Sequence, residues 1–536
     1  MGLMSRVIGG AAVLCLASLT FADFDGPAPL AWRWAQPTSA APYGSPIVDD
    51  ANVYAAVGGR MYAIERQTGN HVWRYPAGEP IQANFRLGAV LSKDLLIAPA
   101  DDKSIYAVDV KTGQLAWQYL GSDAVATTAV VAGNFVVFGT VKNEIRALNI
   151  ADGKEAWSAP FKVGQGVHPV MSATLNSVIF TTNDSTMVSL DVVSQRKLWE
   201  AKFSRMSPNG SFAVAGDRIY VNSGNFLVCV RGSNGRPIWQ VNTGQQLANG
   251  PAAGAQGVAT MGRNGMMYTY DINGRPVFKK GIELGAPPAG SPIFVGRNVV
   301  VTTTNGGVNL VNPQTGDLIW TYTMPSLNPG ASKPANPAGG GAGDPPIGGT
   351  GGTSSPGGAG GSATQTENPD YVPSAGNPVV AGNSLFVLSR DGSIFAFDKE
   401  LGVDLTPPEV KMLWPNAGDQ IAGKSPMEFI FRAVDLGSGV NPDSLSITIG
   451  GENYIGTINR DGYISVKIVT GMANKPLQNG RKVIVVKVTD WVGNIATASF
   501  AVTIDNTLPA LGSPKPATST GTAGGPGGRG PVGSGG

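Results

Sequence analysis

Short apolar runs rich in β-branched and aromatic residues alternate with Gly, Asn and Asp along most of the chain. This pattern is typical of antiparallel strands joined by tight turns. The runs form a repeated unit, and most copies end on a tryptophan, so that a large aromatic residue recurs every 39–44 residues from Trp73 to Trp320. A repeat of about 40–50 residues is the length of one propeller blade. We therefore expect an all-β protein whose small sheets stack around a ring.

Closing the ring buries the faces of the sheets and protects their edges. Residues 377–402 form one more repeat without a tryptophan, and the segment Leu30–Trp34 resembles the segment that ends the fullest repeat, Leu115–Tyr119. We infer that the N-terminal strand completes the last sheet of an eight-bladed β-propeller. The alternative is a seven-bladed ring that closes before Gly330. The expected blade-docking residues are Trp32, Trp73, Trp117, Trp157, Trp199, Trp239, Phe278 and Trp320.

The fullest copy of the repeat reads Ala107-Val-Asp109-Val-Lys-Thr112-Gly113-Gln-Leu-Ala-Trp117. This frame resembles the tryptophan-docking motif of PQQ-like repeat propellers, over about residues 30–325 and 374–402. That family includes quinoprotein alcohol dehydrogenases and the non-enzymatic propeller subunit of the bacterial outer-membrane β-barrel assembly machinery. A flat indole between blades buries much apolar area, while its N–H still needs a partner. The motif therefore predicts a fold and identifies no catalytic residue.

The N-terminus predicts export. Arg6 precedes an apolar run over residues 7–19, and Thr20-Phe21-Ala22 offers small residues near a cleavage point, which indicates a signal peptide over residues 1–22. The expected location is the periplasm, the cell envelope or the extracellular space. A lipid anchor on Cys15 is the less favoured alternative, because Leu14 is not the small residue that a lipobox places before its cysteine.

Composition divides the rest of the chain. We expect the propeller over residues 23–325, a disordered Gly/Pro-rich insert over 326–373, the last propeller repeat over 374–402 and a disordered tail over 509–536. Between them, residues 403–508 show alternating strands and turns that predict a small β-sandwich. The turns that begin at Asp435 and Asp490 resemble those of bacterial immunoglobulin-like modules.

Charge and hydropathy argue against a nucleic-acid-binding protein and against a membrane-spanning helix after the signal peptide. The formal net charge is +2 with acids and bases interspersed, so the basic face that binds nucleic acid is not expected. After the signal peptide, no run reaches the roughly 20 apolar residues of a membrane-spanning helix. Of the two cysteines, only Cys229 would remain after cleavage of the signal peptide. It should lie buried as a small apolar residue.

Candidate metal ligands lie in the predicted sandwich, where Asp404, Asp435, Asp490 and Asp505 stand near turns. Oxygen ligands suit calcium, but aspartates at such positions commonly cap turns. We therefore favour turn capping and predict no metal site. His71 and His168 are far apart in sequence and are expected to be structural or solvent-facing.

Three functions remain open. The favoured hypothesis is a non-enzymatic, monomeric scaffold that binds a protein partner on the loops and edges of the ring. The second is a surface protein that adheres or binds glycan. The third is a quinoprotein dehydrogenase, which the resemblance disfavours, because those enzymes cover their cofactor with a disulfide between adjacent cysteines and this chain has no such pair. We expect no catalytic residue and no cofactor.

Overall fold

The computed structural model describes residues 24–36, 41–206, 211–326 and 371–511. The predicted signal peptide, residues 327–370 of the predicted insert and residues 512–536 of the tail lie outside this part. Every regular element in the described residues is a β-strand, so the all-β prediction is confirmed. Within the same residues there is no helix long and apolar enough to cross a membrane.

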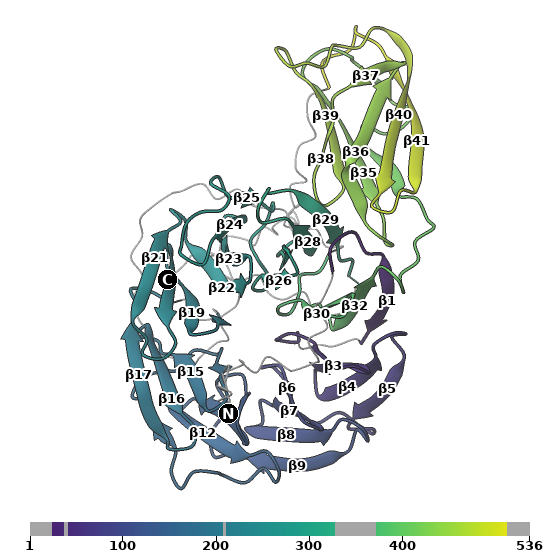
Figure 1. The fold of residues 1–536 in the computed structure, drawn as a ribbon. Helices are drawn as coiled ribbons and strands as arrows, with labels where there is room; N and C mark the ends of the chain where they lie inside the picture. Colours follow the sequence, from purple (N-terminus) through teal and green to yellow (C-terminus); the bar gives the residue numbers. More distant parts are fainter. Residues whose placement is uncertain (1–23, 37–40, 207–210, 327–370, 512–536) are drawn as a thin grey trace, which may run out of the picture.

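Eight four-stranded antiparallel sheets stand around a ring, and we number them as blades 1 to 8 in chain order (Figure 1). Blades 1 to 4 are formed by β2 (Ile47–Val48), β3 (Asn52–Val57), β4 (Arg60–Glu65), β5 (His71–Tyr75); β6 (Val90–Ser92), β7 (Leu95–Pro99), β8 (Ser104–Asp109), β9 (Leu115–Leu120); β10 (Val130–Ala132), β11 (Phe135–Thr140), β12 (Glu144–Asn149), β13 (Phe161–Lys162); and β14 (Ser172–Ala173), β15 (Ser177–Thr181), β16 (Thr186–Asp191), β17 (Arg196–Lys202).

Blades 5 to 8 continue the ring with β18 (Ala213–Ala215), β19 (Arg218–Ser223), β20 (Phe226–Arg231), β21 (Pro237–Asn242); β22 (Leu247–Gly254), β23 (Gly257–Gly262), β24 (Met266–Tyr270), β25 (Ile282–Glu283); β26 (Ile293–Val295), β27 (Asn298–Thr302), β28 (Gly307–Val311), β29 (Leu318–Thr323); and β30 (Val379–Ala381), β31 (Ser384–Leu388), β32 (Ser393–Asp398), β1 (Leu30–Ala35).

Strands from the two ends of the ring form blade 8. The N-terminal strand β1 pairs antiparallel with β32, with Trp32 opposite Ala396. Residues 377–402, which the seven-bladed alternative leaves out of the ring, contain strands β30 to β32 of this sheet. Because one sheet contains both ends, the ring is closed by backbone hydrogen bonds.

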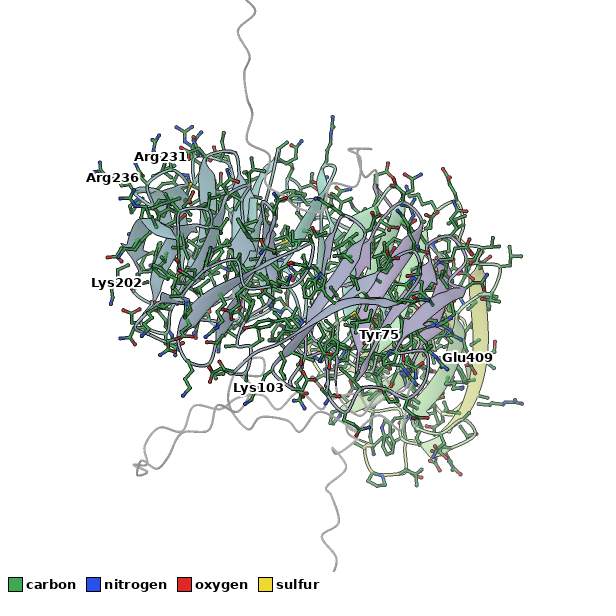
Figure 2. All side chains as sticks on the ribbon, turned by 90° about the horizontal axis from the view of Figure 1, so that it is seen from below. Tyr75, Lys103, Lys202, Arg231, Arg236 and Glu409 are labelled. Carbon is green, nitrogen blue, oxygen red and sulfur yellow. The ribbon has the colours of Figure 1, made fainter. Side chains whose placement is uncertain are left out.

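The innermost strands have two or three residues each, except β22 with eight, and charged side chains lie on the outer side of the ring. Lys202, Arg231 and Arg236 project outward from the ring (Figure 2). Between successive blades, apolar side chains of facing sheets pack into separate clusters. The ring is therefore held by one apolar layer between each pair of neighbouring blades.

The C-terminal strands form a β-sandwich beside blades 7 and 8 (Figure 1). One sheet has the order β33 (Glu409–Trp414), β35 (Met427–Val434), β39 (Tyr463–Ile468), β38 (Thr457–Ile458). The other has the order β34 (Gln420–Ile421), β41 (Ile495–Ile504), β40 (Gly480–Asp490), β36 (Val440–Ile449), β37 (Glu452–Tyr454). Buried side chains from both sheets share one core, among them Phe429, Ile464 and Val486. The immunoglobulin-like assignment and the exact domain boundaries stay predictions.

Candidate functional site

The large aromatic residue of seven of the eight blades lies against a turn of the next blade. The indole N–H of Trp73 donates to the carbonyl oxygen of Val110 at 2.7 Å. Val110 follows Asp109, whose Oδ1 accepts the N–H of Thr112 at 2.8 Å and so holds the turn. In five other blades the indole N–H donates to the carbonyl oxygen at the equivalent position of the next repeat. These pairs are Trp32 to Arg66, Trp117 to Ile150, Trp157 to Val192, Trp199 to Gly232 and Trp239 to Ile272. These contacts connect neighbouring blades.

The frame glycine makes room for the aromatic ring. Gly113 has a φ of 69°, and a Cβ atom built on it would lie 2.8 Å from Cγ of Trp73. Phe278 uses the same arrangement, because a Cβ atom on Gly316 would lie 2.8 Å from its Cζ atom. In these two blades the glycine suits both the backbone conformation and the close ring. Blade 4 has Gln195 at the same frame position, with a φ of 55°.

Replacing Gly113 with alanine should lower the free energy of unfolding by about 2 kcal/mol, because the new methyl group meets the indole and the φ angle disfavours an L-residue. Gly164 is a matched control: its φ is 80°, but nothing lies within 4 Å of a Cβ atom there. Gly164→Ala should therefore lose only the backbone part, about 1 kcal/mol. Urea unfolding measures both. Equal losses would show that the indole tolerates the methyl group.

Trp320 departs from the repeat. Its indole N–H donates at 2.9 Å to the carbonyl oxygen of Ser438, which belongs to the sandwich and not to the next blade. Phe24 lies edge-on to its ring with centroids 5.8 Å apart, and Phe397 lies 5.1 Å away. Trp320 is fully buried at 0% exposure, compared with 8% for Trp73. The last docking position of the ring therefore joins the sandwich to the propeller.

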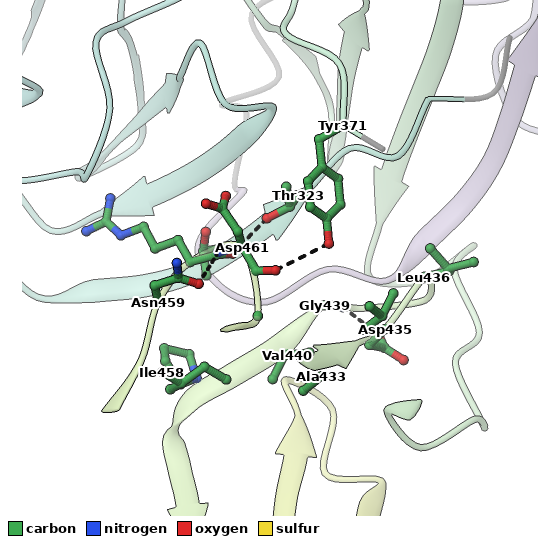
Figure 3. A pocket seen from close by; sticks show the side chains of 15 residues that line it. Thr323, Tyr371, Ala433, Asp435, Leu436, Gly439, Val440, Ile458, Asn459 and Asp461 are labelled. Carbon is green, nitrogen blue, oxygen red and sulfur yellow. Dashed lines mark hydrogen bonds between the residues drawn. The ribbon is translucent and has the colours of Figure 1, made fainter. Parts of the chain in front are cut away.

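Polar contacts extend this junction along blade 7 (Figure 3). The hydroxyl of Tyr322 donates to the carbonyl oxygen of Leu436 at 3.1 Å, and the hydroxyl of Thr323 donates to that of Arg460 at 2.9 Å. The side-chain amide of Asn305 donates to Oδ1 of Asp461 at 3.0 Å. A cavity of about 30 Å³ remains between the two domains. Two separate loops of the sandwich are thus fixed on one blade.

Three of the four candidate aspartates come together next to this junction. One carboxylate oxygen each from Asp404, Asp435 and Asp490 lies within 4.8 Å of the others. Their segments are the linker before β33, the end of β35 and the end of β40. Asp505 lies apart, where its Oδ2 accepts the side-chain amide of Gln420 at 2.9 Å. We call the first three the carboxylate cluster.

Backbone and hydroxyl donors surround the carboxylate cluster. Oδ2 of Asp435 accepts the N–H groups of Gly439 and Ser438 at 2.7 and 2.9 Å. Oδ1 of Asp490 accepts three consecutive N–H groups, those of Val492, Gly493 and Asn494. Each carboxylate therefore holds a turn. Among the described residues, these three are also the one group of at least three acidic, histidine or cysteine side chains whose ligand atoms lie close together, and carboxylate oxygens suit a hard cation.

The pKa values of two carboxyls of the cluster shift in opposite directions. Burial raises the pKa of Asp435 to about 6. The hydrogen bond from the N–H of Gly439 lowers this pKa in part, and the negative charge of Asp404 raises it further. Burial also acts on Asp404, but the hydrogen bonds from Ser438 and Thr406 outweigh it and hold the pKa of Asp404 below its usual value. Asp435 thus takes up a proton before Asp404 does.

The remaining candidates lie in separate places. His71 is exposed on β5, whereas His168 is buried before β14, with Nδ1 at 2.9 Å from the hydroxyl oxygen of Thr181. Cys229 is fully buried on β20. The structure therefore brings neither histidine into the carboxylate cluster.

Comparison with known proteins gives the family. A family model described as outer membrane protein assembly factor BamB matches residues 30–223 and 183–338, which together are more than half of the chain. The chain belongs to this family. BamB of Burkholderia pseudomallei is 24% identical over 349 residues, covering 61% of this chain and 87% of that protein. The resemblance to PQQ-like repeat propellers is thereby confirmed.

Other relatives share only part of their length with this chain. The match to serine/threonine-protein kinase AfsK of Streptomyces griseus is 23% identical and covers 42% of this chain but 28% of the kinase. Quinoprotein ethanol dehydrogenase of Pseudomonas aeruginosa is 30% identical over 98 residues, covering 17% of this chain and 16% of the enzyme. The chain thus spans less than a third of either protein.

Solved structures agree on the fold. The crystal structure of BamB from Moraxella catarrhalis superposes with a TM-score of 0.50 at 15% identity, covering 69% of this chain and 97% of that one. Quinohemoprotein alcohol dehydrogenase from Comamonas testosteroni gives a TM-score of 0.50 at 14% identity, covering 72% and 78%. At these identities the likeness concerns the propeller fold alone.

Proposed function

We propose that this chain is an exported, non-enzymatic scaffold that binds a protein partner in the bacterial cell envelope. The observation that carries the proposal is the extent of the match to the assembly factor: it includes 87% of BamB from Burkholderia pseudomallei, against 16% of the quinoprotein ethanol dehydrogenase. The match thus extends over most of the assembly factor and is not limited to a single repeat.

The geometry of the ring supports a binding role. The repeated residues, such as Trp73 and Gly113, are used for contact between blades. Their turns are held by local hydrogen bonds, so the loops stand on a rigid base. Surface side chains, and not the frame, would then determine what binds.

The dehydrogenase alternative needs chemistry that this sequence does not offer. By resemblance, a quinoprotein enzyme covers its cofactor with adjacent cysteines, whereas the two cysteines of this chain are Cys15 and Cys229. The carboxylate cluster lies in the sandwich and not in the ring. We therefore propose no cofactor for the propeller. The second hypothesis remains a surface protein in which the sandwich is a stalk or adhesive module and the propeller binds glycan or protein.

Photo-crosslinking in the native envelope tests the scaffold. Val193 is 67% exposed in the turn between β16 and β17, and Val141 is 55% exposed between β11 and β12. In an antiparallel meander these two turns lie on opposite faces of the ring. A photoreactive phenylalanine should capture a discrete protein partner from one of the two positions and not from both. Absence of a partner at both positions, with a melting temperature raised by pyrroloquinoline quinone, would favour the dehydrogenase; calcium alone is the control.

A further inference from the structure

Most sheet edges in the described residues are protected against pairing with another chain. The outer strands of blades 1, 2, 4, 5, 7 and 8 each have a register shift beside the aromatic residue, as between Ala63 and Ile64. In blades 3 and 6, the outer strands β13 and β25 have only two residues each. In the sandwich, β33 carries Glu409 and Lys411 and has a register shift, and β38 has two residues. Shifts, charges and short strands are the usual ways to protect an edge.

Strand β41 lacks these protections. It pairs with β40 over ten consecutive residue pairs without a register shift. Residues 495–504 read Ile-Ala-Thr-Ala-Ser-Phe-Ala-Val-Thr-Ile and contain no charge and no proline. On its other side, β41 pairs only with β34, at Thr503 and Ile504. On that side the first half of β41 has no paired strand among the described residues, and β33 of the other sheet lies beside β41 without pairing to it.

The backbone of this edge points outward at every second residue. The N–H of Gly418 donates to the carbonyl oxygen of Ala501 at 2.7 Å, and the N–H of Thr503 donates to that of Asp419 at 2.9 Å. Odd-numbered residues of β41 thus direct their N–H and C=O groups away from β40. Ile495, Thr497 and Ser499 continue the same alternation, and no backbone group in the described part of the chain bonds to theirs on that side. Their side chains are exposed.

We propose that residues 495–499 form a docking edge for a short, uncharged, extended segment of a protein partner, which would add a strand to the sandwich. This inference rests on the proposed scaffold function and gives it a second binding surface. Main-chain hydrogen bonds would supply the affinity. The small exposed side chains of Thr497 and Ser499 would admit β-branched or small residues beside them.

The length of the edge favours a peptide segment over a second copy of the chain. At one end the Gly418–Asp419 turn covers β41, and at the other Trp491 packs against the core of blades 7 and 8. Five residues of strand span only about 17 Å. A stable dimer usually buries about 1,200 Å² or more, which so short an edge does not offer alone. A single extended segment fits this length.

The test measures binding of a fluorescein-labelled peptide of alternating threonine and valine to the purified protein by fluorescence anisotropy. The same peptide, N-methylated at alternate residues so that one edge cannot donate, is the control probe. Thr497→Pro removes one outward N–H without touching the bonds to β40, and it should weaken binding about tenfold, as expected for one lost hydrogen bond. Thr497→Lys should weaken binding too, whereas Val483→Lys, with the same charge on the neighbouring strand β40, should change it less than about twofold.

Amide hydrogen exchange gives a second readout. Exchange at Ile495, Thr497 and Ser499 should slow only when the unmethylated peptide is present. Failure of that peptide to bind the wild-type protein would overturn the proposal. So would a concentration-dependent dimer that Thr497→Pro abolishes, because a second copy would then occupy the edge. Crosslinks from Val193 or Val141 report on the propeller separately, so the scaffold proposal can stand or fall independently of this edge.

Discussion

Replacing Trp320 with alanine should lower the free energy of unfolding by about 3 to 5 kcal/mol and uncouple the sandwich from the propeller. The side chain is fully buried among Phe24, Phe397 and the sandwich loop. Its removal leaves a cavity and deprives the carbonyl oxygen of Ser438 of its donor. Wild-type protein should unfold with both domains in one transition, and the variant should show the sandwich melting first. Calorimetry with limited proteolysis of the linker at residues 399–408 measures this.

Trp73→Ala is the matched control. It removes the same side chain from the same frame position, but its indole N–H bonds to Val110 within the propeller. It should destabilise the ring by a similar amount without exposing the linker to protease. Trp320→Phe keeps most of the packing and loses only the N–H, so its cost should be about 1 kcal/mol. If Trp320→Ala and Trp73→Ala leave the linker equally protected, the indole of Trp320 does not couple the domains.

The sequence predicted the repeat well because the repeat is a local pattern. The frame from Ala107 to Trp117 contains its own turn and its own aromatic residue. The strand at residues 30–34 could be assigned to the last blade because it resembles the outer strand of blade 2, and β1 does pair with β32. Periodicity and similarity between copies are visible without coordinates.

The partner of Trp320 could not be predicted in this way. The carbonyl oxygen it meets is 118 residues further along the chain, in a domain of another fold. One sign was present: the last repeat reads Asp398-Lys-Glu-Leu-Gly402, with leucine where the fullest copy has Thr112. In the structure, Gly402 lies against Pro29 and not against an indole, because a Cβ atom on it would be 2.6 Å from the carbonyl oxygen of Pro29. The entry of the N-terminal segment has displaced the usual contact.

The carboxylate cluster shows the same limit. Asp404, Asp435 and Asp490 were each recognisable as turn residues, because each stands in a Gly-, Asn- or Pro-rich segment. Their convergence depends on how the linker, β35 and β40 meet beside blade 7. Asp505 had equal standing in the sequence, yet it caps a turn elsewhere. A local sequence pattern can predict that an aspartate caps its own turn. Only the tertiary structure determines which of these aspartates lie close enough for their charges to interact.

The convergence leads to the second large effect, which is a pH dependence of stability. The pKa of Asp435 is raised to about 6 in the folded protein, whereas an aspartate in an unfolded chain has a pKa of about 3.9. Between these values the folded state binds more protons than the unfolded state. The contribution of Asp435 to stability is therefore fully present below about pH 4 and is lost as the pH rises through about 6. A shift of about two pKa units corresponds to about 3 kcal/mol.

Asp435→Asn should remove this loss, because an amide oxygen can still accept the N–H groups of Ser438 and Gly439 without adding charge beside Asp404 and Asp490. The variant should match the wild type near pH 4 and be more stable by up to about 3 kcal/mol near pH 8. Urea unfolding across this range, in buffer with a chelator so that no cation neutralises the cluster, measures the difference. Asp505→Asn is the opposite control: hydrogen bonds from Thr507 lower the pKa of Asp505, so that variant should lose stability above about pH 4. Parallel pH profiles for the wild type and Asp435→Asn would show that Asp435 stays ionised in the fold.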